Sequence, residues 1–263
     1  MSVEPEAGSR GASMPRPLSP PFRLRLLDGG LHPCTYLENR QARFRFFFAD
    51  DLPPEIYHAF MDRNFRRSGH SVYQPVCPSC RACMMLRVPV ERFAPSRSQR
   101  RCVRRNADLT VEIGEPSPTD EKYALYRRYL QARHVGGMVE DDNPDSFVAF
   151  LYSSPTNTVE FVYRDPAGRL AAVGICDVSL HSISTVYFYF DPDQPRRGLG
   201  TFGVLKEIEV ARDRGIPWYY MGYWVKDART MDYKRHFRPC ELLCPDGQWR
   251  ELTPDAPEPP GDG

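Results

Sequence analysis

Residues 186–201 read VYFYFDPDQPRRGLGT and decide how the chain folds. The aromatic and β-branched run at 186–190 predicts a strand. The polar turn at 191–197 leads to Gly198 and Gly200, which open a long helix that ends at Gly215. Glycine at a helix N-terminus lets an anion approach the free backbone N–H groups. The stretch therefore indicates an anion-binding strand–turn–helix unit, with a plain strand-to-helix turn as the alternative.

Strands are predicted on both sides of this unit. Hydrophobic runs at 158–163, 170–179 and 183–190 come before the turn, and 217–223 returns after the helix. Antiparallel strands followed by a strand–turn–helix–strand unit predict an α+β domain. Two helices upstream are predicted at about 117–133 and 143–152, where Ser117–Pro118 and Asn143–Pro144 provide starts.

The N-terminal half also alternates strands and helices. Strands are expected at 22–27, 42–48, 71–76 and 84–90, with a short helix at 54–65. We therefore expect an N-terminal α+β domain over 22–115 and a second domain over 116–252. The tails at 1–21 and 253–263 are rich in Pro and Gly and poor in large apolar residues, so we expect them to be disordered.

Composition places the chain among ordinary globular proteins. It has 263 residues, of which 41% are hydrophobic and 26% charged. No apolar run has the length of a membrane span, and the N-terminus has no hydrophobic signal core. We expect a cytoplasmic protein with no membrane partner, whose eight cysteines stay reduced.

A strongly basic helix is predicted from PSRSQRRCVRRNAD, residues 95–108, although the formal net charge of the chain is only +1. Ser96 and Gln99 have the spacing of a capping box. Five arginines follow, at positions Arg97, Arg100, Arg101, Arg104 and Arg105. Helical spacing places most of them on one face. We interpret this face as a phosphate-binding surface; a solvated face, or pairing with acids elsewhere, is the alternative.

A cysteine group is a second candidate site. Cys77, Cys80 and Cys83 form CPSCRAC, and two-residue spacers suit tetrahedral zinc or an iron–sulfur cluster. A fourth ligand is missing nearby, and Cys34 or His32 is the candidate from a distance. A set of plain thiols without metal is the alternative.

The chain has no Ser-His-Asp order, no HExxH and no Walker sequence, and its histidines are scattered. Aromatic strands supply mostly core. Because strand side chains alternate between faces, Tyr187, Tyr189, Tyr223 and Trp224 are candidates for lining a cleft.

Several segments together resemble one family. The turn DPDQPRRGLGT resembles that of the GNAT acyltransferase fold, although Pro195 stands where that turn has Gln or Arg. The segments YQPVCPSCRAC, RVPVERFAPSRSQRRCVRRNADL, YRRYLQARH, FYFDPD and GYWVKDARTMDYKRHFRP resemble the bacterial aminoacyl-tRNA–protein transferases, specifically the aspartate/glutamate leucyltransferases. The resemblance runs in order from about Leu31 to Trp249.

This resemblance implies a GNAT-like C-terminal domain with an N-terminal domain packed against it. It implies that an amino acid moves from aminoacyl-tRNA to proteins with N-terminal Asp or Glu, which marks them for degradation by the N-degron pathway. The arginines would then hold tRNA phosphates, because phosphate contacts supply much of the affinity of proteins for nucleic acids. Eukaryotic relatives carry a metal-binding cysteine group, which this chain matches in part.

The implied chemistry requires no cofactor. An aminoacyl ester is already activated, and an α-amine with a pKa near 8 is partly neutral at pH 7. Positioning and oxyanion stabilisation then supply most of the acceleration. By their position we favour Tyr187, Asp191, Tyr223 and Lys234 for catalysis, with Tyr189 beside them.

An acidic N-terminal side chain calls for a cation. The candidates are Arg66, Arg67, Arg235 and Arg238, together with Lys234.

Leucine is the expected donor residue and arginine the alternative. An apolar lining from the aromatic strand ends suits leucine, whereas an arginyl pocket needs a buried carboxylate. Asp177, Asp191 and Asp227 lie near strand ends and keep that alternative open. Two other classes also remain: a coenzyme A-dependent acetyltransferase, and an RNA-binding zinc module without catalysis.

Overall fold

The computed structural model describes residues 24–133, 143–228 and 230–253. The expected tails at 1–21 and 253–263 lie outside these ranges, apart from Thr253. An eight-stranded sheet dominates the molecule, in the order β14-β13-β7-β12-β11-β10-β9-β8. Its strands are β7 (Met84–Pro89), β8 (Thr110–Gly114), β9 (Thr158–Arg164), β10 (Leu170–Val178), β11 (Ser182–Phe190), β12 (Trp218–Trp224), β13 (Glu241–Leu243) and β14 (Trp249–Glu251).

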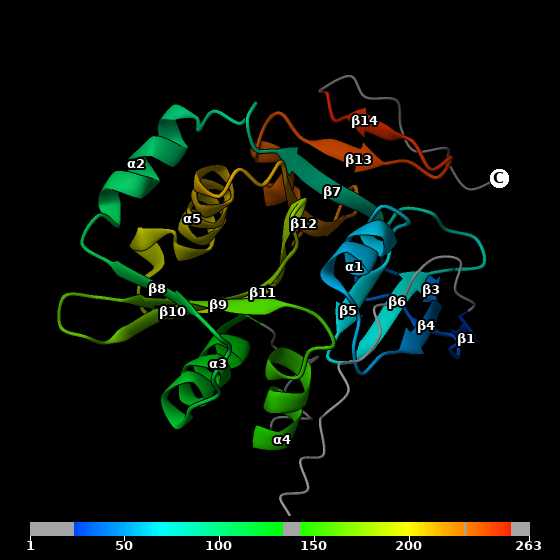
Figure 1. Cartoon of the computed structure of the whole chain (residues 1–263), viewed down its shortest axis with the longest axis horizontal. Helices are drawn as coiled ribbons and strands as arrows, with labels where there is room; N and C mark the ends of the chain where they lie inside the picture. The colour runs from blue at the N-terminus through cyan, green and yellow to red at the C-terminus, as the bar shows by residue number, and fades with distance from the viewer. Residues whose placement is uncertain (1–23, 134–142, 229, 254–263) are drawn as a thin grey trace, which may run out of the picture.

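Helices cover both faces of this sheet (Figure 1). One face carries α2 and α5, and the other carries α3, α4 and a π-helical turn, η1. The bounds are α2 (Arg97–Arg105), α3 (Asp120–Arg133), α4 (Pro144–Phe147), η1 (Val148–Tyr152) and α5 (Leu199–Asp213). Two short 3-10 turns complete this part of the chain: η2 (Pro195–Arg197) precedes α5, and η3 (Asp232–His236) follows β12.

A smaller N-terminal unit packs at the end of the sheet formed by β7, β12 and β13 (Figure 1). It contains a four-stranded sheet in the order β1-β4-β6-β5, the pair β2-β3 and helix α1. The bounds are β1 (Leu27–Asp28), β2 (His32–Pro33), β3 (Gln41–Ala42), β4 (Phe44–Phe48), α1 (Pro54–Met61), β5 (Arg66–Ser68) and β6 (Ser71–Pro75). Phe47, Phe65, Met85 and Tyr223 belong to the shared core between the two units.

The sheet topology confirms the expected α+β, GNAT-like fold. β8 to β11 are antiparallel neighbours, β11 and β12 are parallel, and α5 connects them. The expected domain boundary at 115 does not coincide with a break in this sheet. β7 and β8 precede residue 115 and still pair with β12 and β9.

Local sequence signals predict the start of helix α2 correctly and those of helix α3 and strand β1 only approximately. The capping box is formed, since the Ser96 side chain accepts the Gln99 N–H and the Gln99 side chain accepts the Ser96 N–H. Helix α3 begins later than Pro118, because the Thr119 hydroxyl accepts the backbone N–H of Lys122 and so caps the first turn. Of the strand expected at 22–27, the described residues 24–27 contribute only Leu27 to β1.

Candidate active site

The candidate site lies where β11 and β12 separate. The two strands pair at only three positions, Ser182–Trp218, Ile183–Tyr219 and Ser184–Tyr220. Residues 185–190 of β11 and 221–224 of β12 continue beyond that point without pairing to each other, and we call this stretch the seam. An irregularity in the β10–β11 register, between Ile175 and Cys176, falls opposite the start of the seam. Unpaired backbone groups there are available to other partners.

Arg66 of β5 reaches into the seam from the N-terminal unit. Its guanidinium donates to the Ser184 hydroxyl (3.1 Å) and to the Thr185 carbonyl (2.7 Å). It also lies against Gly222, where a Cβ atom would come within 3.0 Å of the Arg66 Cζ atom. Gly222 has φ of +75°, so glycine is favoured here by backbone conformation as well as by space. Arg66 thus joins the N-terminal unit to the end of the β11–β12 pairing.

Lys234 of η3 places a second cation at the same seam. Its side chain is buried, and its Nζ donates to the Tyr223 carbonyl at 2.6 Å. Burial lowers the pKa of Lys234 to about 7, and the nearby Arg66 guanidinium contributes to this decrease, which the nearby Cys83 thiol opposes. We call Arg66 and Lys234 the cation pair.

A buried acid lies on the α5 face of the sheet below the start of the seam. Glu207 accepts a hydrogen bond from the Tyr219 hydroxyl at 2.5 Å. Burial raises the pKa of Glu207 to about 7, opposed by the hydrogen bond from Tyr219 and by the nearby Cys176 and Thr185 side chains. Sequence reasoning missed Glu207. The available signal was an acid on the same helical face as Gly203, Val204 and Ala211, all of which are buried.

The tyrosines expected in the cleft point to different cores. Tyr187 and Tyr189 pack against α3 and η1, and the Tyr189 hydroxyl pairs with that of Tyr152 at 3.0 Å. Tyr223 instead donates to the Asn64 carbonyl at 2.9 Å, in the core shared with the N-terminal unit. Of this expected set, only Tyr223 meets Lys234 directly, through its backbone carbonyl.

Asp191 is held by the turn in which it lies. Its carboxylate pairs with Arg128 of α3 and accepts the Gln194 amide at 2.9 Å. These contacts fix the end of β11 and the start of the turn, and a catalytic role for Asp191 stays a prediction.

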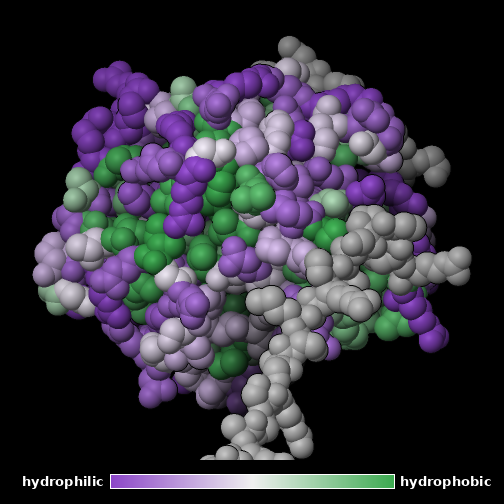
Figure 2. All heavy atoms as spheres, in the orientation of Figure 1, coloured by the Kyte–Doolittle hydropathy of each residue, from purple (hydrophilic) through white to green (hydrophobic). Residues whose placement is uncertain are grey.

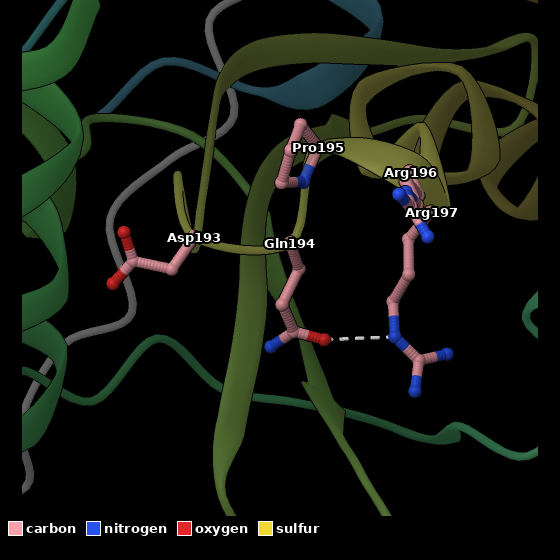
Figure 3. A pocket seen from close by; sticks show the side chains of 5 residues that line it. All are labelled: Asp193, Gln194, Pro195, Arg196 and Arg197. Carbon is pink, nitrogen blue, oxygen red and sulfur yellow. Dashed lines mark hydrogen bonds between the residues drawn. The ribbon is translucent and has the colours of Figure 1, made fainter.

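The turn before α5 is open at the helix N-terminus. Gly198 adopts a φ of +66°, and no side chain among the described residues caps the first turn of α5. Figure 3 shows the adjoining cavity, of about 330 Å³, which Asp193, Gln194, Pro195, Arg196 and Arg197 line. Arg197 pairs with Asp108 at 2.7 Å and accordingly contributes little free positive charge, whereas Arg196 is exposed.

The five arginines of α2 form an exposed surface beside this turn. Arg97, Arg100, Arg101, Arg104 and Arg105 are all exposed, and none forms an ion pair with an acid in the described ranges. The other side of α2 packs on the turn through Cys102 and Asn106, whose side chains donate to the Arg197 carbonyl. Figure 2 shows hydrophilic surface over α2, with hydrophobic surface next to it over α5. We call the five arginines the arginine face; pairing with acids of the described chain does not account for them.

The four expected metal ligands gather near one another. Burial raises the pKa of Cys83 to about 12, and the nearby thiols of Cys77, Cys34 and Cys80 contribute to this increase. We call these residues the cysteine cluster. Within the described ranges, however, no three His, Cys, Asp or Glu side chains are arranged to hold a metal ion. Metal binding at the cysteine cluster therefore stays a prediction.

Three of the expected acceptor-binding arginines differ from Arg66 in their surroundings. Arg67 is buried and forms a two-pronged ion pair with Asp177, at 2.6 and 2.7 Å, so it is already used within the fold. Arg235 pairs with Asp232 at 3.5 Å on the surface. Arg238 is exposed and donates to the Arg235 carbonyl.

No helix in the described ranges is long and apolar enough to cross a membrane.

Comparison with known proteins identifies the family. Residues 121–244 match the family described as arginine-tRNA-protein transferase, C terminus, and residues 32–101 match its N-terminus counterpart. An aspartate/glutamate leucyltransferase of Stenotrophomonas maltophilia strain K279a is 44% identical over 239 residues, covering 88% of this chain and 94% of the relative. One from Pseudomonas putida strain W619 is 40% identical and covers 84% and 94%.

Among solved structures, the C-terminal domain of a putative lysylphosphatidylglycerol synthetase from Agrobacterium fabrum is similar with a TM-score of 0.48 and 13% identity, covering 80% of this chain and 79% of that one. The family matches span both units of the fold, and the relatives align over most of the chain. The chain therefore belongs to the arginine-tRNA-protein transferase family.

Proposed function

We propose that the protein transfers leucine from leucyl-tRNA to the N-terminal Asp or Glu of protein substrates. Relatives named aspartate/glutamate leucyltransferase, up to 45% identical, support the donor and the acceptors. The main structural support for tRNA binding is the arginine face. It is exposed, has no ion-pair partner within the described chain and lies beside the open N-terminus of α5. The cytoplasm, where charged tRNA is made, is the expected location.

The reaction is an aminolysis. The neutral α-amine of the acceptor attacks the ester carbonyl carbon of the aminoacyl-tRNA. A peptide bond forms, the bond to the terminal ribose oxygen breaks, and the amine proton ends on the ribose hydroxyl that leaves. Since the ester is already activated, holding the two reactants together at the seam supplies most of the acceleration. The product begins with leucine, the destabilising residue of the N-degron pathway.

The phosphate path we propose runs from the arginine face to the turn before α5. Arg105 donates to the Arg196 carbonyl, so the end of α2 and the turn form one continuous positive surface. Free N–H groups at the start of α5 then suit a phosphate near the 3′ end of the tRNA. From there the seam begins on the same sheet, at the strand that precedes the turn.

The carboxylates that could form an arginyl pocket are already paired or exposed, which favours leucine over arginine as the transferred residue. Asp177 is occupied by Arg67 and Asp191 by Arg128, while Asp227 is exposed. An unpaired guanidinium is costly to desolvate, so a donor pocket without a free acid suits an apolar side chain. Glu207 is a further buried acid: the Tyr219 hydroxyl donates to its Oε2, its Oε1 has no hydrogen-bond partner among the described residues, and burial raises its pKa to about 7, which favours the neutral form.

Radiolabelled Leu-tRNA and Arg-tRNA, each offered to peptides that begin with Asp, Glu or Ala, test the proposal. We expect label only from Leu-tRNA and only on the Asp and Glu peptides. Use of Arg-tRNA with no use of Leu-tRNA would overturn the donor, and acetyl transfer from acetyl-coenzyme A in place of both would overturn the class. Asp and Ala peptides labelled alike would overturn the acceptor.

A further inference from the structure

Two buried cations meet at the seam although they come from distant parts of the chain. Arg66 is 8% exposed and Lys234 is 7% exposed. Neither forms an ion pair with any acid in residues 24–133, 143–228 or 230–253. Two like charges in a buried place repel each other, which is why Arg66 lowers the pKa of Lys234. The two cations therefore lack a balancing negative charge among the described residues.

Hydrogen bonds compensate these cations only in part. Arg66 donates to the Ser184 hydroxyl and to the Thr185 and Val186 carbonyls, and it also hydrogen-bonds the Tyr73 side chain. Lys234 donates to the Tyr223 carbonyl. A guanidinium has five N–H donors and an ammonium has three, so both groups keep capacity for a further acceptor. Neutral oxygens satisfy the donors but do not neutralise a buried charge.

The neighbouring residue in the same strand is a buried cation whose charge is paired within the fold. Arg67 follows Arg66 in β5 and is also buried, yet Asp177 meets it with both carboxylate oxygens. The chain thus supplies an acid for one of the two arginines and, within the described residues, none for the other. A carboxylate from outside the described chain would complete the second site.

We propose that the cation pair binds the side-chain carboxylate of the acceptor's N-terminal Asp or Glu. This inference rests on the proposed function and names the residues that select its acceptor. A carboxylate can bridge the guanidinium of Arg66 and the ammonium of Lys234. The α-amine of the same residue, a few bonds away, would then lie at the seam where β11 leaves β12. A neutral side chain would leave the Arg66 guanidinium without an anion and would not hold a proton on Lys234, and this penalty selects against it.

The test measures peptide binding without tRNA, so that it does not depend on the transfer reaction. Peptides that begin with Asp or with its neutral counterpart Asn are titrated into the whole protein by calorimetry. We expect the wild type to prefer Asp by about 30-fold or more. Lys234→Met removes one cation and should remove most of this preference, with the Asn peptide unaffected. Arg214→Met removes a charge from an exposed residue just after α5, outside the candidate acceptor site, and should leave the preference unchanged.

A second measurement needs no substitution. Binding the Asp peptide should draw a proton onto Lys234, so the apparent enthalpy should depend on the ionisation heat of the buffer more strongly for the Asp than for the Asn peptide. This readout stands even if Lys234→Met fails to fold.

Equal affinity of the wild type for both peptides, or a folded Lys234→Met variant that keeps the Asp preference, would overturn the inference. The outcomes also separate it from the proposed function. A protein that prefers the Asp peptide but transfers no leucine refutes the reaction and leaves the cation pair standing. A protein that transfers leucine to Asp and Asn peptides alike refutes the cation pair and leaves the reaction.

Discussion

Reversing two charges of the arginine face should flatten the salt dependence of tRNA binding. Arg101→Glu with Arg104→Glu changes two exposed side chains that have no ion-pair partner among the described residues. Neither residue contributes to the contacts that dock α2 on the turn, which run through Cys102 and Asn106. The double variant should therefore fold like the wild type, within about 1 kcal/mol in free energy of unfolding.

The magnitude follows from the number of phosphates that the arginines contact. Each neutralised phosphate contributes about 0.7 to 0.9 to the slope of log affinity against log salt concentration. If all five arginines contact phosphates, the affinity of the wild type falls about 100- to 500-fold between 50 and 200 mM salt. Losing two contacts lowers the slope by about 1.4 to 1.8, so the variant should lose only about 20- to 40-fold over the same range.

Fluorescence titration of labelled tRNA at a series of salt concentrations measures both slopes. The matched control is Arg25→Glu with Arg63→Glu, which changes the net charge equally at two exposed residues of the N-terminal unit. The control should keep the wild-type slope. If the α2 variant and the control have the same slope as the wild type, the arginine face does not hold tRNA phosphates.

Four further results are expected. Glu207 has a pKa of about 7 in the folded protein and 4.5 as an ordinary glutamate, so the free energy of unfolding should fall as pH rises from 4.5 to 7. Glu207→Gln should add up to about 3 kcal/mol to the free energy of unfolding at pH 8 and almost nothing at pH 4. An equal effect at both pH values would disprove this. Asp177→Asn leaves Arg67 buried without its ion-pair partner and should lower the free energy of unfolding, measured with denaturant, by about 3–5 kcal/mol. The control Asp246→Asn, in the exposed pair with Arg250, should not change it measurably, and similar losses from both variants would contradict this prediction. The ratio of the affinity for an Asp peptide to that for an Asn peptide should fall as pH rises above 7, because Lys234 loses its proton there. A ratio that does not change with pH would contradict the role of Lys234. Metal analysis of protein purified without oxygen tests the cysteine cluster: bound zinc or iron with loss of stability on chelation would support the prediction, and metal content near zero with no such loss would end it.

The strand–turn–helix unit could be predicted from sequence because its signals are local. The aromatic run of β11, the glycines before α5 and Gly215 after it each act within a few residues, and the structure has the elements there. The capping box of α2 is equally local. These signals, with the family resemblance, establish the fold and the arginine face.

The seam could not be predicted in the same way. Arg66 meets Thr185 across 119 positions of sequence, and Lys234 meets Tyr223 only because η3 folds back on β12. Which of two adjacent arginines receives an acid depends on where Asp177 lies in β10, and neither charge nor spacing reveals this. The positioning contacts of Asp191 could not be foreseen for the same reason, since its partner Arg128 comes from another helix.

The most direct test of the central claim is to let the enzyme choose its donor. The protein is incubated with a complete mixture of aminoacyl-tRNAs and with peptides that begin with Asp, Glu and Ala, and each peptide is sequenced by mass spectrometry. We predict one added leucine on the α-amine of the Asp and Glu peptides and no addition to the Ala peptide. Addition of a different amino acid, or unmodified Asp and Glu peptides after full turnover conditions, would contradict the account.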